Sequence, residues 1–99
     1  MQQEKRLMRQ RYQMKIQVTL QDILEGERDV TNNPISRAIQ RAVGSRWCIT
    51  NDTVIYEMAP PYRVAALDPE VCNNWRQYRS SGLMWPFEFD IYFEDEEAH

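Results

Sequence analysis

The feature of this chain that most limits its fold is an alternation of apolar and polar side chains near each end. From position 87 to position 93, every second residue is aromatic or aliphatic, and acidic residues or tyrosine lie between them. Residues 14–20 alternate in the same way, from Met14 to Leu20. A period of two is typical of a strand that buries one face. We therefore predict two strands of a sheet that helices cover on one side only.

A short helix is predicted directly after the first strand. Thr19 can accept hydrogen bonds from free backbone N–H groups, and Asp22 favours the positive end of a helix. The helix spans Leu20–Glu25, and Gly26 is expected to end it in the left-handed conformation.

The sequence predicts two longer helices with the same boundary residues. Each begins with an Asn or Asp followed by a proline, and each ends at a glycine. These residues are Asn33, Pro34 and Gly44 for the first helix, and Asp68, Pro69 and Gly82 for the second. Their apolar residues recur at helical spacing. The apolar stripe consists of Ile35, Ala38, Ile39 and Ala42 in the first, and of Val71, Trp75 and Tyr78 in the second.

Between the two longer helices the sequence predicts a β-hairpin. Its strands are Trp47–Thr50 and residues 53–58, joined by Asn51 and Asp52, which tolerate the positive φ of a tight turn. Residues 62–67 form an optional third, short strand. The predicted order is β-α-α-β-β-(β)-α-β. It describes an α+β fold in which a small, mostly antiparallel sheet of four or five strands is covered on one face by two or three short helices.

Charge is distributed unevenly along the 99 residues. Residues 1–15 hold five cationic side chains against Glu4 alone, a net charge of +4, whereas residues 88–99 hold six acidic side chains and no Lys or Arg. The residues between hold seven Arg and eight acidic side chains, so the total of −3 hides a basic beginning and an acidic end. We divide the chain into a basic extension over residues 1–13, a single domain over residues 14–93 and an acidic tail over residues 94–99.

No motif for catalysis, metal binding or cofactor binding accompanies this pattern. The only histidine is His99, so Cys48 and Cys72 lack the usual base of a cysteine nucleophile and the spacing of zinc ligands. No apolar run approaches the roughly 18 residues that cross a bilayer, and the N-terminus lacks the apolar part of a signal peptide. We expect a cytoplasmic protein that is not an enzyme and has reduced cysteines, no cofactor and no membrane partner.

Two stretches of the chain combine capping and core residues in a distinctive pattern. They are Val18-x-x-x-Asp22-Ile23-x-x-Gly26 with Asn33-Pro34-Ile35-x-x-Ala38-Ile39-x-Arg41-Ala42, and Pro86-Phe87-Glu88-Phe89. This pattern resembles a group of short, mostly uncharacterised proteins of bacteriophages and their hosts. That group often has Cys where this chain has Asn33 and Ala where it has Ser36, so no role of that Cys is carried over. The resemblance implies a phage or prophage origin and supplies no catalytic residues.

We interpret the acidic end as a surface that binds a host protein. On a strand, Glu88 and Asp90 point the same way about 6.6–6.8 Å apart, near the roughly 7 Å between every second phosphate of one DNA strand. The leading hypothesis is a non-catalytic host-interaction or anti-defence protein of phage type, an inhibitor that presents a nucleic-acid-mimicking surface to a defence factor. Trp85 and Tyr92 are expected to contribute as exposed aromatic residues. The predicted contact residues are Glu88, Asp90, Tyr92, Glu94, Asp95, Glu96 and Glu97.

A group of arginines supports an alternative, a small module that binds nucleic acid or nucleotides. Arginine beside aromatic rings suits phosphates and single-stranded bases. The predicted residues are Arg37, Arg41, Arg46, Trp47, Arg76 and Arg79. This alternative requires the two longer helices to present their arginines on one shared face. A homo-oligomer is a third alternative, because Trp75, Tyr78 and Trp85 exceed what so small a core needs.

Overall fold

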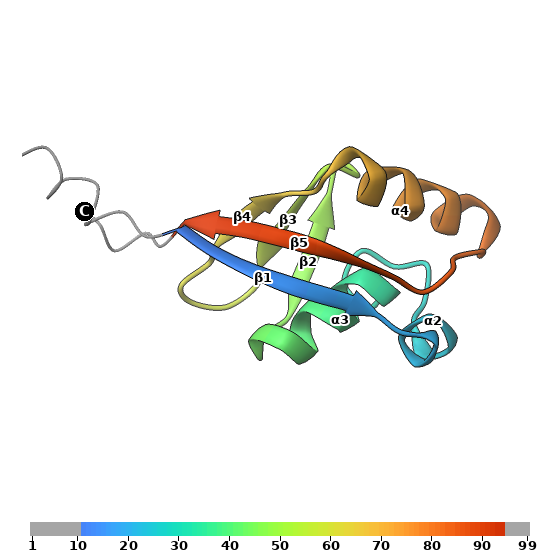
Figure 1. Ribbon diagram of the computed structural model, residues 1–99, viewed down its shortest axis with the longest axis horizontal. Helices are drawn as coiled ribbons and strands as arrows, with labels where there is room; N and C mark the ends of the chain where they lie inside the picture. The colour runs from blue at the N-terminus through green and yellow to red at the C-terminus, as the bar shows by residue number, and fades with distance from the viewer. Residues whose placement is uncertain (1–10, 95–99) are drawn as a thin grey trace, which may run out of the picture.

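The structure, a computed structural model, describes residues 11–94 (Figure 1). Its elements are β1 (Arg11–Val18), α2 (Leu20–Glu25), α3 (Pro34–Val43), β2 (Trp47–Thr50), β3 (Val54–Glu57), β4 (Val64–Ala66), α4 (Pro69–Ser81) and β5 (Phe87–Glu94). The predicted α+β class and the predicted order of elements, including the optional strand, are confirmed. None of the helices within residues 11–94 is both long and apolar enough to span a bilayer.

The strands form two antiparallel sheets instead of the single sheet that we expected. β1 and β5 pair along their whole length, from Arg11 opposite Glu94 to Val18 opposite Phe87. β2, β3 and β4 form the other sheet, in that order. β4 lies close to β5 but belongs to a different sheet. Side chains also contact each other between the two sheets, since the guanidinium of Arg63, just before β4, lies 4.7 Å from the centroid of the Phe93 ring of β5.

The apolar face of the β1–β5 pair forms one wall of the core. Ile16 and Val18 of β1 and Ile91 of β5 are almost completely buried, as their alternation predicted. Trp47 of β2 and Trp75 of α4 are fully buried in the same cluster. In Figure 1, α3 lies beside β1 and α4 lies on the other side of the strand pair, beyond β5. The helices therefore close the core from two sides.

Helix α2 spans the predicted residues Leu20–Glu25, but Gly26 does not end it in the predicted conformation. The Thr19 hydroxyl accepts a hydrogen bond from the Asp22 backbone N–H at 3.2 Å, and the Thr19 N–H donates to the Asp22 carboxylate at 2.9 Å. Gly26 has φ −78° and ψ 167°, which is extended backbone and not the expected left-handed conformation. A Cβ at this position would lie 2.8 Å from the Asp22 carbonyl oxygen and 2.9 Å from Cδ of Pro34. Close packing of the backbone is therefore the reason for this glycine.

The longer helices begin and end where the sequence predicted. The Asn33 side chain accepts a hydrogen bond from the Ser36 N–H at 2.8 Å and caps α3. Gly44 (φ 99°) and Gly82 (φ 79°) end α3 and α4 in the left-handed conformation. Asp68 precedes Pro69 at the start of α4, but its side chain makes no capping hydrogen bond within the described part of the chain.

The paired strands also move the expected domain boundaries. β1 begins at Arg11, so residues 11–13, which we placed in a basic extension, continue the strand. They do so because β5 runs on to Glu94 and provides pairing partners, with Gln13 opposite Tyr92. The rest of the predicted extension and residues 95–99 lie outside the described residues.

Candidate functional site

The acidic side chains of β5 lie beside polar and basic side chains of β1. In the register of the two strands, Lys15 is opposite Asp90 and Gln17 is opposite Glu88. The Lys15 ammonium is 3.5 Å from Glu88 Oε1 and 3.8 Å from Asp90 Oδ1. Gln17 Nε2 donates to Glu88 Oε2 at 3.2 Å. The unequal charge of the two ends is thus partly compensated inside the fold, because the basic and acidic segments are neighbouring strands.

This pairing alters the predicted acidic surface but does not remove it. The side chains of Glu88 and Asp90 share one ammonium group, so they are not a row of unpartnered charges like the phosphates of DNA. Glu88 keeps 53% of its side chain exposed, and Tyr92 is also exposed, as predicted. The backbone of Glu94 belongs to β5. Asp95, Glu96 and Glu97 lie outside the described residues, so the acidic tail stays a prediction.

Arg41 and Arg37 of α3 bind carboxylates of α2. Arg41 forms a bidentate pair with Asp22, at 2.6 Å and 2.9 Å, and also donates to the Gln17 carbonyl oxygen at 2.9 Å. Burial opposes the ionisation of Asp22, but hydrogen bonds from Arg41 and Thr19 outweigh it and lower the pKa of Asp22. Arg37 donates to Glu25 at 2.6 Å. Both arginines therefore hold α3 against neighbouring elements.

Arg79 and Arg76 of α4 belong to a different cluster. Asp52, in the turn between β2 and β3, accepts hydrogen bonds from Arg79 at 2.6 Å and from Trp75 Nε1 at 2.8 Å. Arg76 Nε lies 4.0 Å from the other oxygen of Asp52. The arginines of α3 and those of α4 therefore belong to two separate clusters of ion pairs, one at Asp22 and Glu25 and the other at Asp52.

The remaining members of the predicted arginine site are also separated. Arg46 is exposed just before β2. Trp47 is fully buried, with its ring 5.8 Å from that of Phe93 and its Nε1 donating to Ser45 Oγ at 3.1 Å. Its ring belongs to the core and is not available to stack on a base. The arrangement therefore offers little support for the nucleic-acid alternative.

Large apolar side chains are exposed at the end of the molecule where α2 and the loop between α4 and β5 lie (Figure 1). Leu20 and Leu24 of α2 are 59% and 74% exposed, and Leu83 and Trp85 of the loop are 64% and 84% exposed. Met84, between the last two, packs against the core instead. We call Leu20, Leu24, Leu83 and Trp85 the apolar end surface.

The burial of Asp22 explains why two leucines of this surface point outward. Asp22 is 1% exposed and is held by Arg41 and by the capping bonds of Thr19. Residues two positions away on a helix lie about 200° around its axis. Leu20 and Leu24 are each two positions from Asp22, so the polar anchor that faces inward turns both leucines toward solvent.

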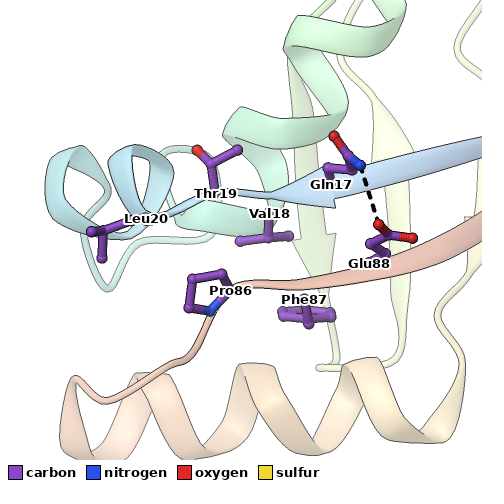
Figure 2. Close-up of a pocket in the computed structure, with 7 residues that line it drawn as sticks. All are labelled: Gln17, Val18, Thr19, Leu20, Pro86, Phe87 and Glu88. Carbon is purple, nitrogen blue, oxygen red and sulfur yellow. Dashed lines mark hydrogen bonds between the residues drawn. The ribbon is translucent and has the colours of Figure 1, made fainter.

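Two hollows adjoin the apolar end surface, and Pro86 and Phe87 line both of them. The first hollow has a volume of about 430 Å³ and is lined by Gln17, Val18, Thr19, Leu20, Pro86, Phe87 and Glu88. The second hollow, of about 210 Å³, is lined by Glu70, Asn74, Gln77, Leu83, Met84, Trp85, Pro86 and Phe87. Figure 2 shows Leu20 and Pro86 at one end of the first hollow and the Gln17–Glu88 hydrogen bond at the other. The two hollows share Pro86 and Phe87 as lining residues, and we call the pair of hollows the groove.

Sequence reasoning found one residue of this site and missed the leucines. Trp85 was predicted to be exposed, and it is. Leu20 was placed both in the alternating stretch of residues 14–20 and at the start of the predicted helix Leu20–Glu25; in the structure β1 ends at Val18 and Leu20 begins α2. The useful signal was the capping pattern at Thr19, which already favoured a helix from Leu20 onward.

Within residues 11–94, no three His, Cys, Asp or Glu side chains are grouped closely enough to hold a metal ion. Cys48 and Cys72 are buried free thiols. The chain matches no protein-family model, no curated protein and no solved structure. The geometry of the apolar end surface and its groove is therefore the basis for a functional proposal.

Proposed function

We propose that this chain is a protein-binding domain whose contact surface is the apolar end surface and the groove beside it. The observation that carries this proposal is the exposure of Leu20, Leu83 and Trp85 at two adjoining hollows, with Leu24 also exposed on the same helix as Leu20. Single exposed apolar residues are common on proteins, but a group of large ones beside a groove is typical of interaction sites.

Energetic considerations support this use of the surface. Burying a large aliphatic or aromatic side chain stabilises a complex by roughly 1.5–3 kcal/mol relative to leaving it in water. Tryptophan is enriched among the residues that contribute most to binding, and Trp85 is 84% exposed. Pro86 follows it and restricts the loop, which lowers the entropy that the loop loses on binding. Trp85 is therefore our candidate for the main anchor.

The earlier hypotheses fit this proposal to different degrees. Glu88 lines the first hollow, so part of the predicted acidic surface adjoins the apolar end surface. A host protein as the partner, an anti-defence role and a phage origin stay predictions of the sequence. Of the arginines of the nucleic-acid alternative, Arg37, Arg41, Arg76 and Arg79 are engaged by Asp22, Glu25 and Asp52, which leaves them less free to bind phosphates, whereas Arg46 is exposed.

A comparison of two double variants tests the proposal. Leu20→Ser with Trp85→Ser removes two exposed apolar side chains from the groove. Tyr62→Asn with Val64→Thr removes two from the far side of the molecule, where Tyr62 and Val64 are 59% and 57% exposed, and serves as the matched control. Asn suits position 62 because Tyr62 has φ 59°. Each tagged protein is used as bait in lysate of its native cell, and the bound proteins are quantified.

We expect a partner protein to be retained by the wild type and by the control variant, and to be lost from the groove variant. Retention of every bound protein by the groove variant would contradict the proposal. Circular dichroism of each bait confirms that a lost interaction does not reflect unfolding.

A further inference from the structure

The charged side chains that line the groove are acidic in both hollows. Glu88 lines the first hollow and Glu70 lines the second. No Lys or Arg is among the residues that line either one. The exposed apolar side chains of the groove thus lie between two carboxylates.

Both carboxylates keep capacity to bind a cation. Glu88 accepts one hydrogen bond from Gln17 and lies 3.5 Å from the Lys15 ammonium, but its side chain is 53% exposed. Two carboxylate oxygens offer about four acceptor sites, so several of them remain. Glu70 is exposed and makes no ion pair within the part of the chain that the structure describes.

Nearby cations do not neutralise the groove. Lys15 lies opposite Asp90, two residue pairs from Gln17 and Glu88, and its one ammonium serves the carboxylates of both Glu88 and Asp90. Arg28 packs tightly against Gly82, where an added Cβ would lie 2.6 Å from one of its Nη atoms, and it lines neither hollow. The charged side chains that line the two hollows are therefore acidic only, Glu88 and Glu70.

We infer that the partner binds this groove with a basic segment that carries two apolar anchor side chains, one for each hollow. This inference rests on the proposed function and specifies the chemistry of the partner. One anchor occupies the first hollow against Val18 and Phe87, and the other packs beside Trp85 in the second. Lys or Arg residues that flank the anchors meet Glu88 and Glu70, where they form exposed, salt-sensitive ion pairs.

The same charges disfavour other occupants. A second copy docked about a twofold axis would bring its own Glu70 and Glu88 toward those of the first copy, because an isologous interface pairs each surface with itself. Like charges in such a contact repel each other. A nucleic acid or an anionic lipid surface would meet the same repulsion. A basic partner segment satisfies both the apolar and the charged features of the groove.

A selection from a displayed library of random 12-residue peptides tests the inference with a defined probe. The baits are the wild type, the groove variant Leu20→Ser with Trp85→Ser, and a charge variant Glu70→Gln with Glu88→Gln. A matched charge control, Glu27→Gln with Asp68→Asn, removes two exposed carboxylates that line neither hollow. Enriched peptides are synthesised, and their Kd values are measured by calorimetry at about 50 mM and about 500 mM NaCl.

We expect enriched peptides to contain two large apolar residues and a net positive charge. The groove variant should weaken their binding about tenfold or more, and the charge variant roughly three- to tenfold at low salt. The charge control should change the Kd by less than about twofold. High salt should reduce the difference between the wild type and the charge variant.

The possible failures can be told apart. Peptides that depend on Trp85 but have no positive charge, or that bind the charge variant equally well, would overturn the inference and leave the proposed function standing. The absence of any peptide that distinguishes the wild type from the groove variant would overturn both. Sedimentation that shows a dimer of the wild type but not of the groove variant would assign the groove to a second copy and overturn the inference.

Discussion

Glu57 and Arg63 form a buried bidentate ion pair at the place where the two sheets come together. Arg63 Nε and Nη2 each donate to a different Glu57 oxygen at 2.9 Å, and the Glu57 side chain is 2% exposed. The face of the same guanidinium lies 4.7 Å from the Phe93 ring of β5. Arg63 thus connects β3 to β5, which belong to different sheets.

The first prediction concerns the pH dependence of this pair. Hydrogen bonds from Arg63 outweigh burial and, with Ser45, lower the pKa of Glu57 from 4.5 to about 2. A carboxyl group whose pKa is lower in the folded than in the unfolded state stabilises the fold at pH values above its unfolded-state pKa. This stabilisation is lost as the pH falls toward the folded-state pKa. For this shift the gain is about 3 kcal/mol at pH 7 and about half of that at pH 3.

The test compares the wild type with Glu57→Gln by urea unfolding at both pH values. We expect the variant to be less stable by about 3 kcal/mol at pH 7, because the buried ion pair between Glu57 and Arg63 is lost. The difference should shrink at pH 3. A difference that stays constant between pH 7 and pH 3 would contradict the assignment, and Glu70→Gln, at an exposed site, serves as the control.

The second prediction is that Arg41 has a structural role. Arg41→Ala removes both charge-assisted hydrogen bonds to buried Asp22, and we expect a loss of roughly 2 kcal/mol in the free energy of unfolding. Arg41→Lys should recover only part of this loss, because an ammonium cannot reproduce the bidentate geometry. Arg46→Ala, at an exposed position, should change stability by less than about 0.5 kcal/mol. Equal effects of Arg41→Ala and Arg46→Ala in thermal unfolding would be inconsistent with this role.

Local patterns were enough to predict most of the fold. The alternation from Phe87 to Phe93 and the caps at Thr19 and Asn33 depend on neighbours in sequence, and the structure confirms the strand and helices that they indicated. The division into two sheets depends on how strands far apart in sequence approach each other. The alternation pattern is the same in a single sheet and in two, so it could not distinguish them.

The candidate site was less predictable because it depends on pairings between distant residues. The sequence showed a basic and an acidic end, but their contact through Lys15 and Glu88 requires the register of β1 and β5. The outward direction of Leu20 and Leu24 follows from the burial of Asp22 against Arg41, nineteen residues further along the chain.

The third prediction distinguishes two physical reasons why a position requires glycine. At Gly26 the backbone is extended, but an added Cβ would lie 2.9 Å or less from backbone atoms of Asp22 and Pro34. At Gly44 the space is open, but φ is 99°. We expect Gly44→Ala to cost about 1 kcal/mol, from backbone strain, and Gly26→Ala to cost roughly 2–3 kcal/mol, because neighbouring segments must separate. Gly44→Asn should cost less than Gly44→Ala, since Asn tolerates the left-handed conformation.

Unfolding of these variants in urea provides the measurement. If Gly26→Ala is no more destabilising than Gly44→Ala, the close approach of α2 to the start of α3 is not maintained in solution. A variant Gly26→Ser should behave like Gly26→Ala, because both introduce the same Cβ.

The fourth prediction concerns the separation between the surface proposed for binding and the core. Trp85 is 84% exposed, whereas Trp47 and Trp75 are fully buried. Acrylamide should therefore quench mainly the fluorescence of Trp85, and Trp85→Ser should remove most of the quenchable signal while changing stability by less than about 0.5 kcal/mol. Trp75→Phe replaces a buried indole with a smaller ring and removes its hydrogen bond to Asp52, and should cost roughly 2 kcal/mol or more. A loss of more than about 1.5 kcal/mol from Trp85→Ser would show that this side chain supports the fold and is not free to bind a partner.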